Sequence, residues 1–428
     1  MLQNFPGMEE KNGELMIGGV SAVSLAEQFG TPLYVVNETV LRKNMHDFAS
    51  ALSSYEGGGR IFYASKALSV KRILKIAAEE NIGADVVSEG ELRTALAGGM
   101  NPENIMYHGN NKSEKELAFA LSQGVGYTAV DRPEDVYRLA ALSKEYPHKI
   151  KLLFRIVPGI EAHTHDYIRT GSFDSKFGMP IEEALPLMQY AKAQGLCVAG
   201  LHCHIGSQIF ETEPFRDAAK LMMQFLKEAQ ALVGEDACIL NLGGGFGIRY
   251  TEEDSPLPPA DFIQNAVRVV TEAAKELKMK KPMLFFEPGR AIAGTAGSTL
   301  YTVGGVKKTK VGKTYVFIDG GMTDNPRHAL YDAQYEAVIA NRVSDEATQK
   351  VTIAGRLCES GDVISEGILL PPAKEGDILA TFSTGAYCFS MASRYNRVPG
   401  AAMVLVGEEA PCLIVRRQTA EELLSLDL

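Results

Sequence analysis

The sequence predicts an α/β fold: a (β/α)8 barrel of the TIM type joined to a second, β-rich domain built as a sandwich or small barrel. Two observations predict it. Short segments rich in Val, Ile and Phe alternate with amphipathic helical segments in about eight units, the number that closes such a barrel. After residue 295 strong helical periodicity becomes rare and strand-like segments dominate. We expect the barrel over residues 36–294 and the β-rich domain over residues 1–35 and 295–428, with an open doubly wound sheet as the alternative to the barrel.

The expected barrel strands lie between helices whose apolar residues recur at i, i+3 and i+4. The strands are expected at Ile61–Ala64, Gly83–Val87, Asn104–His108, Tyr127–Val130, Lys151–Val157, Val198–His204, Cys238–Leu242 and Pro282–Glu287. The clearest helices are expected at Val70–Glu80, Glu89–Ala97, Ser113–Ser122, Pro214–Leu232 and Ala260–Leu277. The β-rich domain is expected to contain strands at Leu15–Ile17, Leu33–Val36, Tyr315–Asp319, Val351–Ile353, Ile378–Phe382 and Cys412–Arg416.

Composition excludes several classes of partner. The chain has 43 Lys and Arg against 53 Asp and Glu, a net charge of −10, which disfavours nucleic acid and anionic membrane surfaces. The N-terminus has no signal-peptide pattern, and no apolar run is long enough to span a membrane. Six scattered cysteines without a CxxC pair are typical of reduced thiols in a cytoplasmic protein.

Polar and ionisable residues follow the expected barrel strands, and barrel enzymes carry their reactive groups at these C-terminal strand ends. Lys66 directly follows the first strand, where partial desolvation would lower its pKa and allow a Schiff base with an aldehyde cofactor. A lysine that simply reaches solvent from a strand end is the alternative.

A glycine-rich segment and a carboxylate follow the last two strands. Gly243–Gly247, with Ser207 after the sixth strand, could form a phosphate cradle from backbone N–H groups, although a tight turn without ligand has the same pattern. The spacing fits neither a dinucleotide fingerprint nor a P-loop. Glu287 could pair with a protonated pyridine nitrogen; a salt bridge to Arg290 or a helix cap is the alternative.

Two histidines two residues apart, His202 and His204, lie on the sixth strand. His204 could stack on a planar ring or be a hydrogen-bonded core histidine. A metal pair is conceivable here and at His163 and His165, but no third ligand is obvious, so no metal is expected.

Nine motifs in this order give the chain a resemblance to a known family: FYASKA, GADVVSEGEL, HGNNK, DSKFG, HCHIGSQI, GGGFGI, EPGRAI, CESGD and GAY. Together they resemble the fold-type III pyridoxal-phosphate enzymes, the alanine racemase and ornithine decarboxylase superfamily, and most closely the diaminopimelate decarboxylases. The resemblance covers nearly the whole chain. It implies pyridoxal 5'-phosphate as cofactor and decarboxylation of meso-2,6-diaminopimelate to L-lysine and CO2.

The resemblance also implies roles for individual residues. Lys66 looks like the lysine that binds the cofactor, and Cys358 like the proton donor, supplied with Glu359 across the interface of a homodimer with shared active sites. The implied cofactor contacts are Lys66, Asp85, His204, Ser207, Gly244, Gly245, Glu287, Gly289, Arg290 and Tyr387. The implied substrate contacts are Arg290, Arg327, Tyr331, Glu359 and Tyr387.

Substrate choice depends on charge. Diaminopimelate has a distal carboxylate and a distal ammonium, for which Arg290, Arg327 and Glu359 are suitable partners. The alternatives are a related decarboxylase of D- or L-ornithine, lysine, arginine or carboxynorspermidine, a racemase, or a non-catalytic homologue that acts by binding. Residues 158–177 are the candidate lid over the site.

Overall fold

The computed structural model describes residues 1–159 and 176–428. The candidate lid and the pair His163 and His165 therefore lie wholly or mostly outside the described residues. The chain divides into two compact units. The barrel unit comprises Met45–Gly247 and Pro256–Gly289, and the sheet unit comprises Met1–Asn44, Ile248–Ser255 and Arg290–Leu428.

Eight strands of the barrel unit form a closed barrel in which every neighbouring pair is parallel, so the predicted barrel is confirmed and the open sheet is excluded. The strands are β5 (Gly59–Ala64), β6 (Gly83–Val86), β7 (Ile105–Tyr107), β8 (Tyr127–Val130), β9 (Lys151–Arg155), β10 (Cys197–His202), β11 (Ile239–Asn241) and β12 (Met283–Phe286). Buried rings of Phe62, Tyr127 and Phe285 pack against one another inside it. This filled interior is a core rather than a pore, so ligands are expected at the strand ends.

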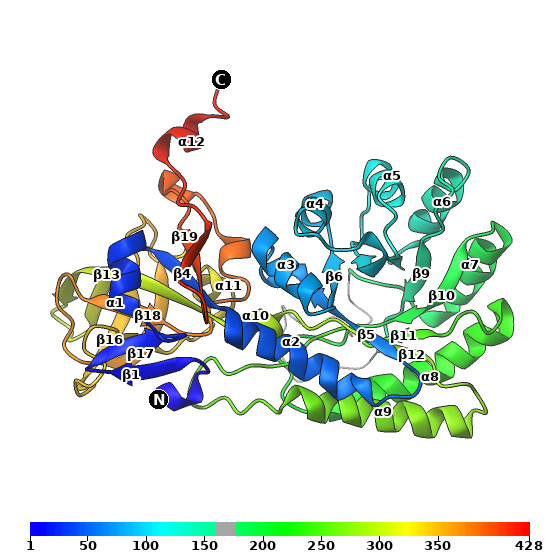
Figure 1. Ribbon diagram of the computed structural model, residues 1–428, viewed down its shortest axis with the longest axis horizontal. Coiled ribbons are helices and arrows are strands. Elements are labelled where there is room, and N and C mark those ends of the chain that lie inside the picture. The colour runs from blue at the N-terminus through cyan, green and yellow to red at the C-terminus, as the bar shows by residue number, and fades with distance from the viewer. Residues whose placement is uncertain (160–175) are drawn as a thin grey trace. The chain divides into compact units, whose positions relative to one another are not determined.

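Helices surround the barrel strands (Figure 1). Their apolar faces are buried, and two of them have side-chain N-caps: Ser88 before α4 and the capping box of Ser113 and Glu116 at α5. They are α3 (Lys71–Glu79), α4 (Glu89–Ala97), α5 (Glu114–Ser122), α6 (Pro133–Leu142), α7 (Ile181–Ala193), α8 (Glu213–Val233) and α9 (Pro259–Glu276). Helix α2 (Glu38–Ser53) contributes residues to both units.

The sheet unit contains a nine-stranded and a three-stranded sheet, as the β-rich prediction requires. The smaller sheet comprises β1 (Met8–Lys11), β2 (Glu14–Ile17) and β3 (Val20–Ser21). The larger comprises β4 (Leu33–Asn37), β13 (Gly297–Lys308), β14 (Thr314–Ile318), β15 (Ala337–Ile339), β16 (Gln349–Ala354), β17 (Val363–Leu370), β18 (Ile378–Thr381), β19 (Ala402–Val406) and β20 (Cys412–Val415). Its helices are α1 (Ala22–Phe29), α10 (Arg290–Ala293), α11 (Arg327–Tyr331) and α12 (Ala420–Leu424).

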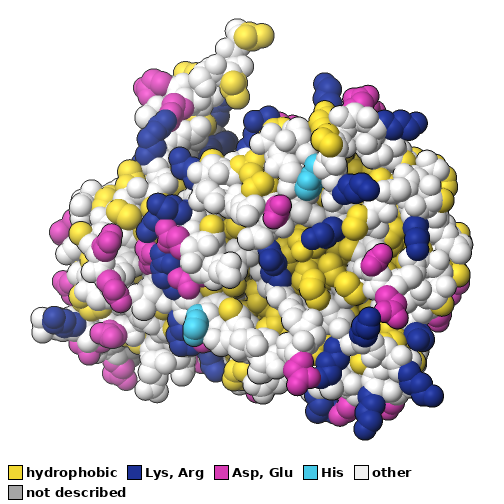
Figure 2. Space-filling model, turned by 45° about the vertical axis from the view of Figure 1, so that its right-hand side comes forward, with side chains coloured by type: hydrophobic (Ala, Val, Ile, Leu, Met, Phe, Trp, Pro, Cys, Tyr) yellow, Lys and Arg dark blue, Asp and Glu magenta, His cyan; other side chains and the backbone are white. Residues whose placement is uncertain are grey.

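The surface and the cysteines complete the description. Basic and acidic side chains are both spread over the face in Figure 2. All six cysteines are free thiols. Of the helices in the described ranges, none is long and apolar enough to cross a membrane.

Candidate active site

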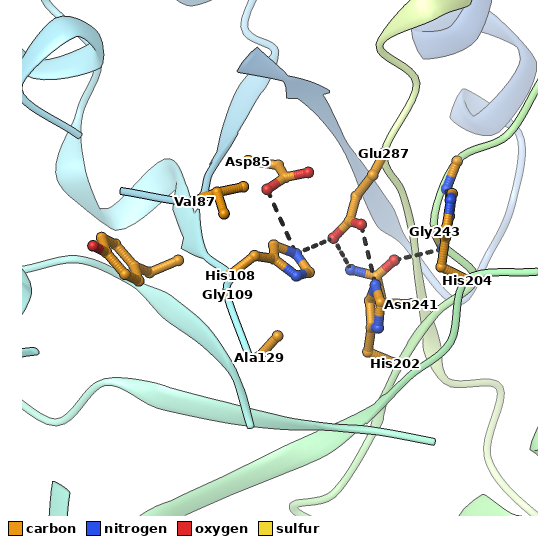
Figure 3. A network of polar contacts seen from close by, with 12 residues as sticks. Asp85, Val87, His108, Gly109, Ala129, His202, His204, Asn241, Gly243 and Glu287 are labelled. Carbon is orange, nitrogen blue, oxygen red and sulfur yellow. Dashed lines mark hydrogen bonds and ion pairs between the residues drawn. The ribbon is translucent and has the colours of Figure 1, made fainter. Parts of the chain in front are cut away.

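Glu287 lies directly after β12 and is buried at the C-terminal end of the barrel (Figure 3). Three side chains from other strand ends donate hydrogen bonds to its carboxylate. Oε1 accepts from His108 Nε2 at 2.8 Å and from Asn241 Nδ2 at 2.6 Å, and Oε2 accepts from His202 Nε2 at 3.1 Å. His108 Nε2 also lies 3.7 Å from Asp85 Oδ1. We call these five residues the Glu287 group.

The ionisable residues of the Glu287 group differ in the direction of their pKa shifts. Burial alone would raise the pKa of Glu287, but His108 and His202 outweigh it and hold that pKa well below its usual range. Burial also lowers the pKa of His108, yet Asp85 and Glu287 outweigh burial and raise it. Burial lowers the pKa of His202 to about 4. At neutral pH Glu287 is therefore anionic and His202 neutral, while the two carboxylates favour the charged form of His108.

The predicted glycine cradle follows β11. Gly243 and Gly245 have φ of +69° and +115°, which L side chains rarely adopt. A Cβ on Gly244 or Gly245 would collide with the carbonyl oxygen of Glu287 or Gly206 respectively. Within the described chain, the N–H of Gly245 has no hydrogen-bond acceptor. The loop therefore presents bare backbone to a ligand.

Asn241 connects the cradle to the carboxylate. Its Oδ1 accepts from the N–H of Gly243 at 2.8 Å while its Nδ2 donates to Glu287. Because one planar amide makes both bonds, the distance between Glu287 and the cradle is fixed by a buried side chain.

The remaining predicted cofactor residues of this unit lie at the same end of the barrel. His204 and Ser207 are half-buried in the loop after β10. Burial first, and then the positive charge of Lys66, lower the pKa of His204 well below its usual range, and its Nδ1 accepts from the N–H of Gly244 at 3.2 Å. Gly289 is buried against Ala64 and Ala67. A neutral imidazole in a fixed orientation suits stacking on an aromatic ring.

Lys66 departs from the prediction. It lies past β5 in the 3-10 turn Ser65–Ala67 and is exposed, whereas both of its neighbours in the turn are buried. The expected burial of the lysine against the strand is therefore wrong, although its charge still acts on Asp85 and His204 at the strand ends.

Five residues of the sheet unit form a second cluster, the two-arginine group: Arg290, Arg327, Tyr250, Tyr331 and Tyr387. The Arg327 guanidinium lies 5.5 Å from the ring centres of Tyr331 and Tyr387 and 5.6 Å from that of Tyr250. Arg290 lies 4.9 Å from the ring centre of Tyr387, and its Nη1 donates to the Tyr250 hydroxyl. Both arginines are buried. Four of the five were predicted as substrate contacts.

Cys358 and Glu359 take no part in the contacts that define the two-arginine group. Both are exposed in the loop between β16 and β17. The Cys358 N–H donates to Asn396 Oδ1 at 2.9 Å, and its carbonyl accepts from the Tyr395 hydroxyl at 3.3 Å. The backbone of Cys358 is thus held in place while its side chain is exposed, and the exposed Glu359 carboxylate accepts from the N–H of Gly361 at 3.4 Å.

Sequence reasoning assigned no role to His108, Asn241 or Tyr250. His108 and Asn241 are the strand-end polar residues of β7 and β11, so their position was the available signal. Tyr250 follows the glycine loop but belongs to the sheet unit, for which no sequence signal existed. His202 and His204 do not converge on one point, since His202 donates to Glu287 and His204 accepts from Gly244.

His108, His202 and Glu287 have ligand atoms within 4.8 Å of one another, a closeness that a metal site would also need. The hydrogen bonds from both histidines to Glu287 account for it. The three residues thus form one hydrogen-bond network.

The barrel groups fit pyridoxal phosphate, which carries a phosphate, an aldehyde and a pyridine nitrogen. The glycine loop offers backbone N–H to the phosphate, Glu287 offers an anionic acceptor to the ring nitrogen, and the exposed Lys66 offers an amine. A closed parallel barrel with these groups at its strand ends defines the class of pyridoxal-phosphate barrels.

Comparisons with known proteins agree with this class. The model of the pyridoxal-dependent decarboxylase family, pyridoxal binding domain, matches residues 38–294. The diaminopimelate decarboxylase of Bacillus subtilis is 45% identical over 98% of this chain and 96% of its own length. That of Staphylococcus aureus is 42% identical over 97% of this chain and 98% of its own. The crystal structure of diaminopimelate decarboxylase from M. jannaschii in complex with L-lysine has a TM-score of 0.93 at 34% identity, covering 100% of this chain and 99% of that one. The chain therefore belongs to the diaminopimelate decarboxylase family of pyridoxal-dependent decarboxylases.

Proposed function

We propose that the protein decarboxylates meso-2,6-diaminopimelate to L-lysine and CO2 with pyridoxal phosphate as cofactor. Bound at the barrel strand ends, this cofactor supplies an aldehyde that reacts with amines and a protonated ring that accepts electrons. In this scheme Lys66 Nζ would hold the aldehyde, and the Gly245 N–H with Ser207, beside Gly244, would hold the phosphate. His204 would stack on the ring and Glu287 would bind the ring nitrogen.

The observation that carries the substrate assignment is the burial of Arg327. Its side chain is 8% exposed, its Nε has no hydrogen-bond partner, and in the described ranges no carboxylate pairs with it. A buried guanidinium without a counter-ion is costly, so the two-arginine group is built for an anionic ligand. A substrate with a distal carboxylate supplies that anion, whereas a substrate that yields a diamine does not.

We further propose that the enzyme acts as a homodimer with shared active sites. Cys358 and Glu359 are exposed in the single chain, which suits residues that serve a partner subunit. In this scheme the Cys358 thiol delivers a proton to the substrate α-carbon and Glu359 accepts from the distal ammonium.

The test is to incubate the protein and pyridoxal phosphate with meso-diaminopimelate, L-ornithine, D-ornithine, L-lysine, L-arginine and carboxynorspermidine in parallel. We measure CO2 release and identify the amine. L-Lysine formed from diaminopimelate alone supports the proposal. Release of CO2 from another substrate overturns the role of the two-arginine group, and release from none overturns the decarboxylase function.

A further inference from the structure

The carboxylate of Glu287 has one acceptor position left. A carboxylate offers about four lone-pair positions, two on each oxygen. The bonds from His108 and Asn241 fill both positions on Oε1, and the bond from His202 fills one on Oε2. Within the described chain Glu287 has no further donor. A ligand with a single N–H therefore meets one defined acceptor atom, Oε2.

His108 is the only one of the three donors that also faces a second carboxylate. Its Nε2 lies 2.8 Å from Glu287 Oε1 and 3.7 Å from Asp85 Oδ1, all three being buried (Figure 3). Asp85 Oδ1 has no hydrogen-bond partner, so it depends on charge rather than on hydrogen bonding at this atom. Without a cation between them, two buried carboxylates repel, and one of them takes up a proton.

We propose that His108 is a positioning residue: it is the counter-ion that keeps Glu287 ionised and turned so that Oε2 receives the ring N–H of the cofactor. This inference rests on the proposed cofactor site and deepens it. The direction of the His108 and Glu287 pKa shifts agrees with the ion pair. His202 makes a similar hydrogen bond but is neutral, so it supplies a donor without a charge.

The ionisable groups that face His108 come from several elements of the barrel. They are Asp85 on β6, Glu91 on α4, Arg155 on β9, His202 on β10 and Glu287 after β12. Arg155 lowers the pKa of His108, so the two carboxylates on β6 and after β12 are what sustain its charge.

The experiment compares pyridoxal phosphate with its analogue in which carbon replaces the ring nitrogen. Both carry the same aldehyde and phosphate, so the ratio of their dissociation constants isolates the ring nitrogen. Calorimetry measures this ratio for cofactor-free wild type, Glu287→Gln, His108→Gln and His202→Gln at pH 6.5 and 8.5. Gln keeps an N–H donor at either histidine and removes the charge only at His108, so His202→Gln is the matched control.

We expect Glu287→Gln to lose the preference for the nitrogen compound, and His108→Gln to reduce it about tenfold or more, as for loss of a charged hydrogen bond. The reduction is larger at pH 6.5, since a proton taken up by Glu287 blocks its remaining acceptor. His202→Gln reduces the preference by less than His108→Gln does, because it changes a neutral donor and removes no charge. Equal affinity for the carbon analogue shows that each variant is folded, and His108→Asn repeats the comparison if His108→Gln does not fold.

A wild-type ratio in His108→Gln at both pH values overturns the inference, as does an equal loss in His202→Gln. These outcomes are separate from failure of the proposed function, in which the cofactor binds with the expected preference but no CO2 is released from diaminopimelate.

Discussion

The charges of individual residues in the Glu287 group affect the stability of the folded protein as well as its binding of ligands. Asp85 is 4% exposed, and burial, opposed by His108, raises its pKa to about 6. In the unfolded chain an aspartate has a pKa of about 4. Between these two pKa values the folded protein binds more protons at Asp85 than the unfolded chain does. The contribution of Asp85 to stability therefore falls as pH rises from about 4 to about 6.

Asp85→Asn removes this cost, because an amide needs no ionisation. We expect the cofactor-free variant to be more stable than wild type at pH 7.5 by about 1–2 kcal/mol, with the gain shrinking towards pH 4. Urea unfolding at pH 4.5, 6 and 7.5 measures it. A variant that is less stable at pH 7.5 would show that the His108–Asp85 attraction outweighs the burial of the carboxylate.

Tyr250 is the residue that joins the two arginines of the sheet unit. Tyr250→Phe keeps the ring beside Arg327 and removes the hydroxyl that accepts from Arg290. We expect KM for diaminopimelate to rise about five- to twentyfold with little change in kcat, since a charged hydrogen bond that orients Arg290 is lost.

Tyr335→Phe is the matched control. Its hydroxyl contacts Cys388 Sγ at 3.7 Å, and its ring packs edge-on against Tyr250. In steady-state kinetics we expect the KM of Tyr335→Phe for diaminopimelate to be close to that of the wild type. An equal rise of KM in both variants would show that the packing of the tyrosine rings, and not the hydroxyl of Tyr250, causes the effect.

At the scale of elements, the loop after β11 sets the cradle. Gly245→Ala combines a φ of +115° with a collision against Gly206 O, so the loop must move. We expect the dissociation constant of pyridoxal phosphate to rise by about tenfold or more, as for a lost charged hydrogen bond. Gly124→Ala is the control, with a φ of +75° and open space around its Cβ, and should bind as wild type does. Calorimetry measures the affinity of both variants for pyridoxal phosphate. Similar affinities would exclude a phosphate cradle at Gly245.

How far the sequence predicts each element depends on whether its pattern is local. The eight barrel strands are predictable because each is a short branched or aromatic run between amphipathic helices, and Glu287 and the glycine loop follow from their strand ends. Strand β13 is not predicted, since Gly304 and Gly305 interrupt it at a register shift. The contacts of Tyr250 with the two arginines, and of His108 with Glu287, join residues far apart in the chain, which no local pattern reports.

At the scale of the whole molecule, the sheet unit contains both a buried group and an exposed one. The two-arginine group is buried, whereas Cys358 and Glu359 are exposed on a loop that its backbone holds in place. Under the proposed function, their burial would let the two arginines select an anionic substrate within one chain. Cys358, the proton donor of the proposed function, is accessible to bulk water within one chain unless another subunit covers it.

Mixed dimers test this arrangement. Lys66→Ala removes the amine that one subunit gives to a site, and Cys358→Ala removes the thiol that the other subunit gives to it. Each variant alone should therefore be inactive or nearly so while remaining folded. If the sites are shared in a twofold dimer, a one-to-one mixture, exchanged through mild dissociation, contains about half mixed dimers, each with one intact site and one doubly damaged site. We expect CO2 release from diaminopimelate to recover to about one quarter of the wild-type rate.

Sedimentation velocity tests for the dimer before and after exchange. Since a site built within one chain always retains one of the two lesions, no recovery in a mixture of proven mixed dimers would place Lys66 and Cys358 in the same subunit's site.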